Sequence, residues 1–156
     1  MEKFLLDTCT WIEFFHERNG VPEHARKAGR ENLCASEVTL AELTYGAINS
    51  GDYDRHIKEP QKLRRDVKVY DISEVFEEYG QIRCALNKIS KKKAKEVGQF
   101  DMLIGATALH YGLTVVTDNV KDFSLMPGVK CVNWGGAVNC SYSSSSGSSP
   151  LLLKSM

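Results

Sequence analysis

Residues 4–11 read Phe4-Leu5-Leu6-Asp7-Thr8-Cys9-Thr10-Trp11 (FLLDTCTW), an apolar run that leads straight into an acid and then into helical spacing. A short apolar run is typical of a buried strand, and an acid directly after it is typical of the N-cap of a helix. The stretch therefore predicts a strand that enters a helix through Asp7.

The same alternation of strand and helix recurs along the chain. Apolar runs bounded by polar or glycine residues predict strands over 3–6, 33–35, 67–70, 113–117 and 130–132. Helical spacing between these runs predicts helices over 10–17, 38–49, 54–65, 74–93 and 101–111. Because strands that alternate with helices are joined by crossovers, the sequence predicts an α/β fold around a parallel sheet.

Length and composition limit the class of protein. A chain of 156 residues holds one core comfortably, and its 42% apolar and 26% charged residues are ordinary for a globular protein. No window approaches the ~20 apolar residues of a membrane span, and no secretory signal is visible, so we expect a cytoplasmic protein. The five cysteines are scattered without a C-x-x-C pair, which favours small buried side chains over disulfides or a zinc site.

Charge gives no general attraction for nucleic acid, because 20 basic and 20 acidic residues balance. Local basic patches are candidates instead, although a solvated helix face is the simpler interpretation of each. They are Lys58, Lys62, Arg64 and Arg65, and Lys88 with Lys91, Lys92, Lys93 and Lys95. After Trp134 the composition turns to glycine and serine, so we expect a domain over 1–134 and a flexible tail over 135–156.

Four acids have simple explanations when each is taken singly. Asp7, Asp101 and Asp118 all stand where a helix or turn is expected to begin, and an acid there is a good cap. Glu42 fits a capping box with Thr39. Ser36 is an equally good N-cap one turn earlier, which would place Glu42 inside the helix as a buried carboxylate in need of a partner.

As a set, the four acids predict a metal site. Asp7 and Asp118 follow the carboxyl ends of two apolar strands, while Glu42 and Asp101 lie on helices beside them. Ligands bind at that edge of an open parallel sheet, and carboxylates that meet there need a compensating cation. Oxygen ligands without histidine or thiolate select a hard ion such as Mg²⁺, whose bound water can attack a phosphodiester.

Other kinds of site lack their motifs. The chain contains no G-x-x-x-x-G-K-[ST], no G-x-G-x-x-G and no G-x-S-x-G, and its four histidines show no H-x₃-H spacing. We expect the histidines to be solvated, with His110 the most buried. A phosphoaspartate mechanism through Asp7 usually needs a second acid two residues on, where this chain has Cys9.

The chain resembles a PIN-domain ribonuclease of the VapC toxin type over residues 1–134, through the stretches "LLDTCTWIEFF", "VTLAELTYGA", "FDMLIGATALHYGLTVVTDNVKDF" and "PGVKCVNW". The resemblance implies a three-layer α/β/α sandwich around a short parallel sheet. It also implies RNA cleavage with Mg²⁺ or Mn²⁺ that leaves a 5′-phosphate and a 3′-hydroxyl. Neutralisation by a small co-expressed antitoxin is a further implication.

The family's site residues carry over position by position. Asp7 and Asp101 would hold the principal ion, and Glu42 would help to orient the ion or its water. Either Asp118 or Asn119 aligns with the last acid, with Thr8 and Thr117 as supporting hydroxyls. The lysine-rich stretch before Asp101 is more basic than the family pattern and is interpreted as a possible RNA entry path through Lys91, Lys92, Lys93 and Lys95.

We therefore expect a metal-dependent endoribonuclease toxin that acts on RNA. The alternatives are a non-catalytic RNA- or protein-binding module with the same fold and a metal-dependent phosphatase. The apolar side chains of Trp11, Ile12, Phe14 and Phe15 exceed what one short helix needs for its core face. Part of this surface is predicted to bind an antitoxin segment or a second subunit, as in a homodimer.

Overall fold

A central parallel sheet organises the fold. The computed structural model describes residues 1–135, so the predicted tail beyond Gly135 lies outside the described residues. Within them, five parallel strands form one sheet in the order β3-β2-β1-β4-β5. The strands are β1 (Phe4–Leu6), β2 (Leu33–Ser36), β3 (Lys68–Tyr70), β4 (Thr114–Val116) and β5 (Lys130–Val132). The predicted strands and their parallel arrangement are confirmed.

The helices form two groups along the chain. The first group is α1 (Thr8–Phe15), α2 (Val21–Ala28), a 3₁₀ turn at Arg30–Asn32, α3 (Glu37–Asn49), α4 (Tyr53–His56) and α5 (Lys58–Asp66). The second is α6 (Phe76–Ile89), α7 (Lys91–Val97), α8 (Gln99–Tyr111) and α9 (Val120–Phe123).

Three helix predictions need correction. The helix predicted over 74–93 is divided into α6 and α7, because Ser90 is extended and its hydroxyl caps α7 by accepting from the Lys93 N–H at 2.9 Å. The helix predicted over 54–65 is also divided, into α4 and α5 at Ile57, which has helical backbone angles and makes no side-chain cap. Helix α2 was not predicted. It begins after Gly20, whose backbone is in the left-handed conformation, and it has a proline in its first turn.

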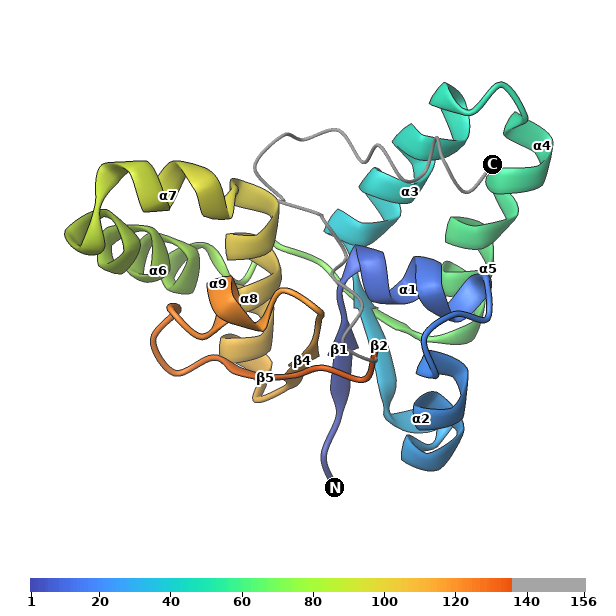
Figure 1. Cartoon of the computed structure of the whole chain (residues 1–156), viewed down its shortest axis with the longest axis horizontal. Helices are drawn as coiled ribbons and strands as arrows, with labels where there is room; N and C mark the ends of the chain where they lie inside the picture. The colour runs from blue at the N-terminus through green and yellow to red at the C-terminus, as the bar shows by residue number, and fades with distance from the viewer. Residues whose placement is uncertain (136–156) are drawn as a thin grey trace.

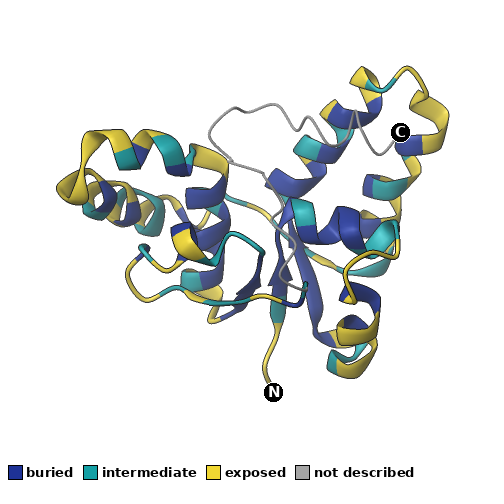
Figure 2. Ribbon diagram, viewed as in Figure 1, coloured by how far each residue is buried: buried dark blue, intermediate teal, exposed yellow. Residues whose placement is uncertain are grey.

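The two helix groups cover opposite faces of the sheet (Figure 1). Alternate residues of a strand point to opposite faces, so Leu5 and Val115 pack in one core, whose helical residues come mainly from α6, α7 and α8. Leu6 and Val116 pack in the other core, against α1, α2, α3 and α5. Figure 2 shows β1 and β2 largely buried between the two helix layers. The fold is therefore a three-layer α/β/α sandwich.

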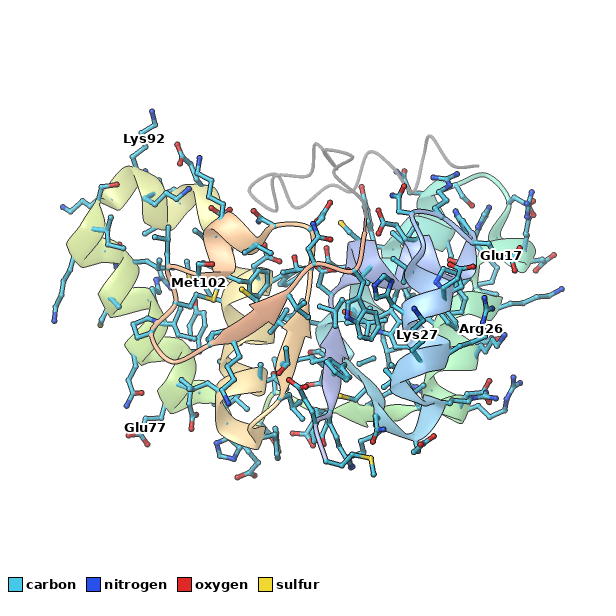
Figure 3. The ribbon with its side chains drawn as sticks, turned by 60° about the horizontal axis from the view of Figure 1, so that its bottom comes forward. Glu17, Arg26, Lys27, Glu77, Lys92 and Met102 are labelled. Atoms are coloured by element: carbon cyan, nitrogen blue, oxygen red, sulfur yellow. The ribbon has the colours of Figure 1, made fainter. Side chains whose placement is uncertain are left out.

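Burial of single residues departs from the sequence expectations at two places. His56, not His110, is the buried histidine: it is 4% exposed and neither ring nitrogen has a partner within residues 1–135. Cys34 is buried as expected, whereas Cys84 is exposed. In Figure 3, Glu77 and Lys92 point outward and Met102 points into the core. No helix in the described part of the chain is long and apolar enough to cross a membrane.

Candidate active site

Asp7 stands at the junction of β1 and α1. It is 5% exposed and is the N-cap of α1, since its Oδ1 accepts from the Thr10 N–H at 2.9 Å. The Thr10 hydroxyl lies 2.7 Å from the same oxygen, and the Thr117 hydroxyl also bonds to this carboxylate. Burial raises the pKa of Asp7, and these hydrogen bonds offset only part of the rise. Asp7 is therefore both a cap and a charge that is costly in the absence of a cation.

Glu42 lies inside α3 and faces α1. Ser36 is the N-cap of α3, because its hydroxyl accepts from the Val38 N–H at 3.1 Å, so the capping box with Thr39 does not form. The hydroxyl of Thr8 instead donates to Glu42 Oε1 at 2.7 Å. Burial raises the pKa of Glu42, the Thr8 bond lowers it and the charge of Asp7 raises it further. Thr8 is thus the partner that this carboxylate needs.

Asp101 and Asp118 approach from the other half of the sheet. Asp101 is 9% exposed in the first turn of α8, whose N-cap is Gly98, so Asp101 is not the cap. Asp118 follows β4, where Asp7 N–H and Val116 C=O bond at 3.0 Å and bring the ends of β1 and β4 together. The parallel order of the strands therefore places both acids at the edge that carries Asp7.

The thiol of Cys9 is influenced by the charges of all four acids. Its pKa is raised well above the ordinary value by burial, and next by the charges of Asp7, Asp118, Asp101 and Glu42 in that order. Because interactions between charges weaken with distance, all four carboxylates lie near this thiol. Cys9 lies on α1, Glu42 on α3 and Asp101 on α8, and these three helices converge above the sheet in Figure 1.

Asp118 has the most exceptional environment of the four. Its Oδ2 is buried without a hydrogen-bond partner in residues 1–135. Burial raises its pKa from 3.8 to about 7, with further contributions from the charges of Asp7 and Glu13. Asn119, the alternative at this position, has its side-chain amide committed to Asp122 Oδ2 at 3.0 Å. The ionisable Oδ2 of Asp118 is therefore available to a ligand, whereas Asn119 is neutral and is held in place through its side-chain N–H.

Glu13 is a fifth acid that the sequence analysis missed. It lies on α1, is 9% exposed, and accepts from the Asn19 side-chain amide at 2.7 Å. Burial raises its pKa, and the charge of Asp7 raises it further. A charged residue inside the otherwise apolar stretch "TWIEFF" is the signal that could have indicated it.

The candidate RNA-binding lysines divide into two kinds. Lys91, Lys92 and Lys95 are exposed on α7, at one end of the molecule in Figure 1. Lys93 is different, because its Nζ lies 2.8 Å from Asp122 Oδ1 and only 20% of its side chain is exposed. Lys93 therefore points into the protein toward the segment that carries Asp118.

The residues at this edge fit a divalent cation. No three His, Cys, Asp or Glu side chains of residues 1–135 are grouped as a ready-made ligand set. Such a set is not required, because Mg²⁺ usually takes one or two carboxylates and keeps several waters. The unpartnered oxygen of Asp118 and the raised pKa values of Asp7 and Glu42 indicate buried negative charge without enough compensation. A hard cation would supply that compensation.

Comparisons with known proteins agree with this geometry. The family model described as "PIN domain" matches residues 4–128. The tRNA(fMet)-specific endonuclease VapC of Salmonella typhimurium is 37% identical over 139 residues, covering 86% of this chain and 99% of the relative. The protein of the same name from Shigella flexneri is 32% identical over 136 residues, with the same two coverages.

Solved structures show the same relationship. A crystal structure of DNA-bound VapBC from Salmonella typhimurium matches with a TM-score of 0.74 and 30% identity, covering 86% of this chain and 99% of that one. The VapBC-1 structure from nontypeable Haemophilus influenzae matches with a TM-score of 0.71 and 26% identity, covering 84% and 97%. By its family model, its sheet and these relatives, this chain belongs to the PIN-domain family of VapC ribonucleases.

Proposed function

We propose that this chain is a metal-dependent endoribonuclease and the toxin of a toxin–antitoxin pair, acting in the cytoplasm. The observation that carries the proposal is the set of acids at the carboxyl edge of the sheet, where Asp7 caps α1, Thr8 bonds to Glu42 and the Oδ2 atom of Asp118 is buried without a partner within residues 1–135. The two relatives with the identities given above are named tRNA(fMet)-specific endonucleases, so tRNA(fMet) is the first substrate to test.

Each site residue has a role in this proposal. Asp7 and Asp101 would hold Mg²⁺, or Mn²⁺ in its place, and Asp118 would complete the acidic shell. When bound, the ion would supply an activated water and stabilise the leaving oxygen of the phosphodiester. Glu42 would orient that water, and Thr8 holds Glu42 in place through the 2.7 Å bond. Thr117 restrains Asp7 and also accepts from the Asn119 N–H at 2.9 Å.

The proposal is tested by incubating the protein with tRNA(fMet) and with a small chromogenic phosphate ester, in Mg²⁺, Mn²⁺ or EDTA. We expect cleavage of the RNA with either metal, no cleavage in EDTA and no hydrolysis of the ester. RNA binding without cleavage would favour the non-catalytic module, and metal-dependent ester hydrolysis would favour the phosphatase.

The exposed lysines of α7 provide a separate prediction about RNA binding. Changing Lys91, Lys92 and Lys95 together to Gln should weaken binding to many RNA sequences. The slope of log affinity against log salt should decrease in magnitude by about 2, since each single-strand phosphate contact contributes roughly 0.7. Cleavage at saturating RNA should change much less. Filter binding at several salt concentrations measures the slope, and an unaltered slope would show that these lysines are solvated surface residues without RNA contacts.

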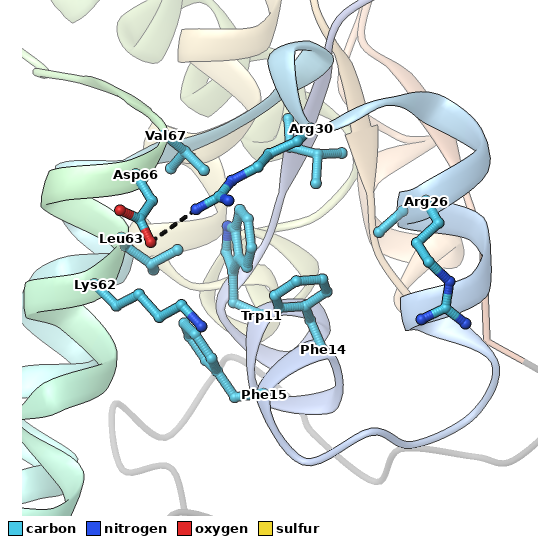
Figure 4. A pocket seen from close by; sticks show the side chains of 11 residues that line it. Trp11, Phe14, Phe15, Arg26, Arg30, Lys62, Leu63, Asp66 and Val67 are labelled. Carbon is cyan, nitrogen blue, oxygen red and sulfur yellow. Dashed lines mark ion pairs between the residues drawn. The ribbon is translucent and has the colours of Figure 1, made fainter.

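The aromatic end of α1 lines a cavity, which we call the α1 pocket (Figure 4). It has a volume of about 220 Å³ and lies between α1, α2 and α5. Trp11 is buried, with its ring centroid 5.3 Å from Phe14 and 6.0 Å from Phe15, which are both partly exposed. The four residues predicted as a partner surface are thus divided: Ile12 lies in the core, Trp11 is buried but lines the α1 pocket, and Phe14 and Phe15 line it while partly exposed.

The chemistry of the α1 pocket suits an antitoxin segment. Three cations line it: Arg26 pairs with Glu23 at 3.1 Å and Arg30 with Asp66 at 2.8 Å, whereas no ion pair within residues 1–135 involves Lys62. Trp11 Nε1 is buried and has no acceptor among residues 1–135. We propose that an antitoxin segment with apolar and acidic side chains occupies this pocket, as an apolar helix or strand does in other groove complexes.

Phe15→Ser tests the α1 pocket. It should weaken binding of a cognate antitoxin by about thirtyfold, because truncating a central interface aromatic costs about 2 kcal/mol or more. Isothermal titration calorimetry measures the affinity. Phe76→Ser is the matched control, since Phe76 is 60% exposed on α6, across the sheet from α1. Equal effects of the two changes would exclude this pocket, and sedimentation of the free protein would test the predicted homodimer.

A further inference from the structure

A chain of hydrogen bonds links α7 to the turn that carries Asp118. Lys93 Nζ lies 2.8 Å from Asp122 Oδ1, and Asp122 Oδ2 accepts from the Asn119 side-chain amide at 3.0 Å. The Asn119 N–H in turn donates to the Thr117 hydroxyl at 2.9 Å. The two residues that these last bonds join, Thr117 and Asn119, are the neighbours of Asp118 in sequence.

This link is partly shielded from solvent. Asp122 is 7% exposed, and 20% of the Lys93 side chain is exposed. The bond to Asp122 raises the pKa of Lys93 further above its ordinary value, which is the direction expected for an ammonium stabilised by a carboxylate. The pair spans 29 residues of sequence, which means that it connects segments the chain does not hold together locally.

We propose that Lys93 is a positioning residue of the nuclease site, acting through Asp122 and Asn119 to hold the turn that carries Asp118. The inference rests on the proposed function and assigns Lys93 a role other than RNA contact. Both oxygens of Asp122 accept hydrogen bonds, one from Lys93 and one from Asn119, so Asp122 connects α7 to the turn. The Oδ2 atom of Asp118 on that turn is buried and has no partner within residues 1–135.

The direction in which Mn²⁺ affinity changes in Lys93→Met distinguishes a positioning role of Lys93 from an effect of its charge alone. Removing a positive charge near an acidic site should by itself strengthen binding of a cation. If Lys93 positions the turn, Lys93→Met should instead weaken binding of Mn²⁺ to the metal-free protein by about tenfold, as expected when a partner behind the metal ligands is lost. Lys93→Arg keeps the ion pair and should restore most of the affinity.

The experiment uses the full chain and measures Mn²⁺ affinity by electron paramagnetic resonance, with a thermal melt of each variant. Lys121→Met is the matched control, because it removes an exposed lysine next to Asp122 that makes no ion pair within residues 1–135. It should not weaken Mn²⁺ binding. Asp122→Asn should resemble Lys93→Met, and the double variant should be little worse than either, since the two residues act as one unit.

Two results would overturn the role of Lys93. The first is Mn²⁺ affinity that is unchanged or stronger in folded Lys93→Met. The second, which applies even if that variant fails to fold, is unchanged affinity in Asp122→Asn. If Lys93→Met instead has a higher KM and a smaller salt slope for RNA, with unaltered Mn²⁺ affinity, Lys93 belongs to the RNA path. A wild-type protein that binds Mn²⁺ but does not cleave RNA would contradict the proposed function alone, because the affinity test requires no substrate.

Discussion

Asp7→Asn should reduce metal-dependent RNA cleavage by at least about a hundredfold, because it removes a charge that would hold the ion while it preserves size. The fold should survive. Asn and Asp are about equal as N-caps, and the amide oxygen can still accept from the Thr10 N–H that now bonds Asp7 Oδ1 at 2.9 Å. Cleavage rate and thermal midpoint, measured on the same preparation, check both parts.

The metal-free form of this variant provides the control. Burial raises the pKa of Asp7, so the ionised carboxylate is costly when no cation is present. Metal-free Asp7→Asn should therefore unfold at the same temperature as the wild type or higher, and added Mn²⁺ should stabilise it less. Asp101→Asn should lose activity similarly, with the double variant little worse. An active Asp7→Asn enzyme would contradict the proposed function and would show that Asp7 serves only as a helix cap.

Asp118→Asn should reduce cleavage by about tenfold or more, whereas Asn119→Ala should have a smaller effect. The reason is that the Oδ2 atom of Asp118 is buried without a partner in residues 1–135, while the Asn119 amide already bonds to Asp122. Rates at saturating RNA and Mn²⁺ dissociation constants for the two variants decide which residue completes the acidic shell. The reverse order of effects would assign that place to Asn119.

The stability of the same variant should depend on pH in a defined direction. The pKa of Asp118 is about 7 in the folded protein against an ordinary 3.8, so the folded state binds the proton more tightly. Its contribution to stability is fully present below the ordinary pKa and is lost as the pH rises to about 7. In the metal-free protein, the thermal midpoint of Asp118→Asn should therefore exceed that of the wild type by more at pH 8 than at pH 5. A constant difference would contradict the raised pKa.

The sequence by itself determined the elements that depend on neighbouring residues. The turn from β1 through Asp7 into α1 follows from an apolar run, a good N-cap and helical spacing, all within one short stretch. For the cap of α3 the sequence left Ser36 and Thr39 as alternatives, and the structure selects Ser36, which places Glu42 inside the helix. Alternating strands and helices were sufficient to predict the parallel sheet, because crossovers leave few other arrangements.

Only the tertiary structure decided which side chains face one another across the sheet edge. The pairing of Thr8 with Glu42 spans 34 residues, and that of Lys93 with Asp122 spans 29. Neither is encoded in local periodicity, because each depends on strand order and on the angle at which a helix leaves its strand. The burial of Glu13 and the unpartnered Oδ2 of Asp118 within residues 1–135 have the same origin, whereas the division of a predicted helix at Ser90 is local, because the Ser90 hydroxyl caps α7. Local chemistry placed the acids at the ends of their elements, and packing of distant segments determined which of them share one environment.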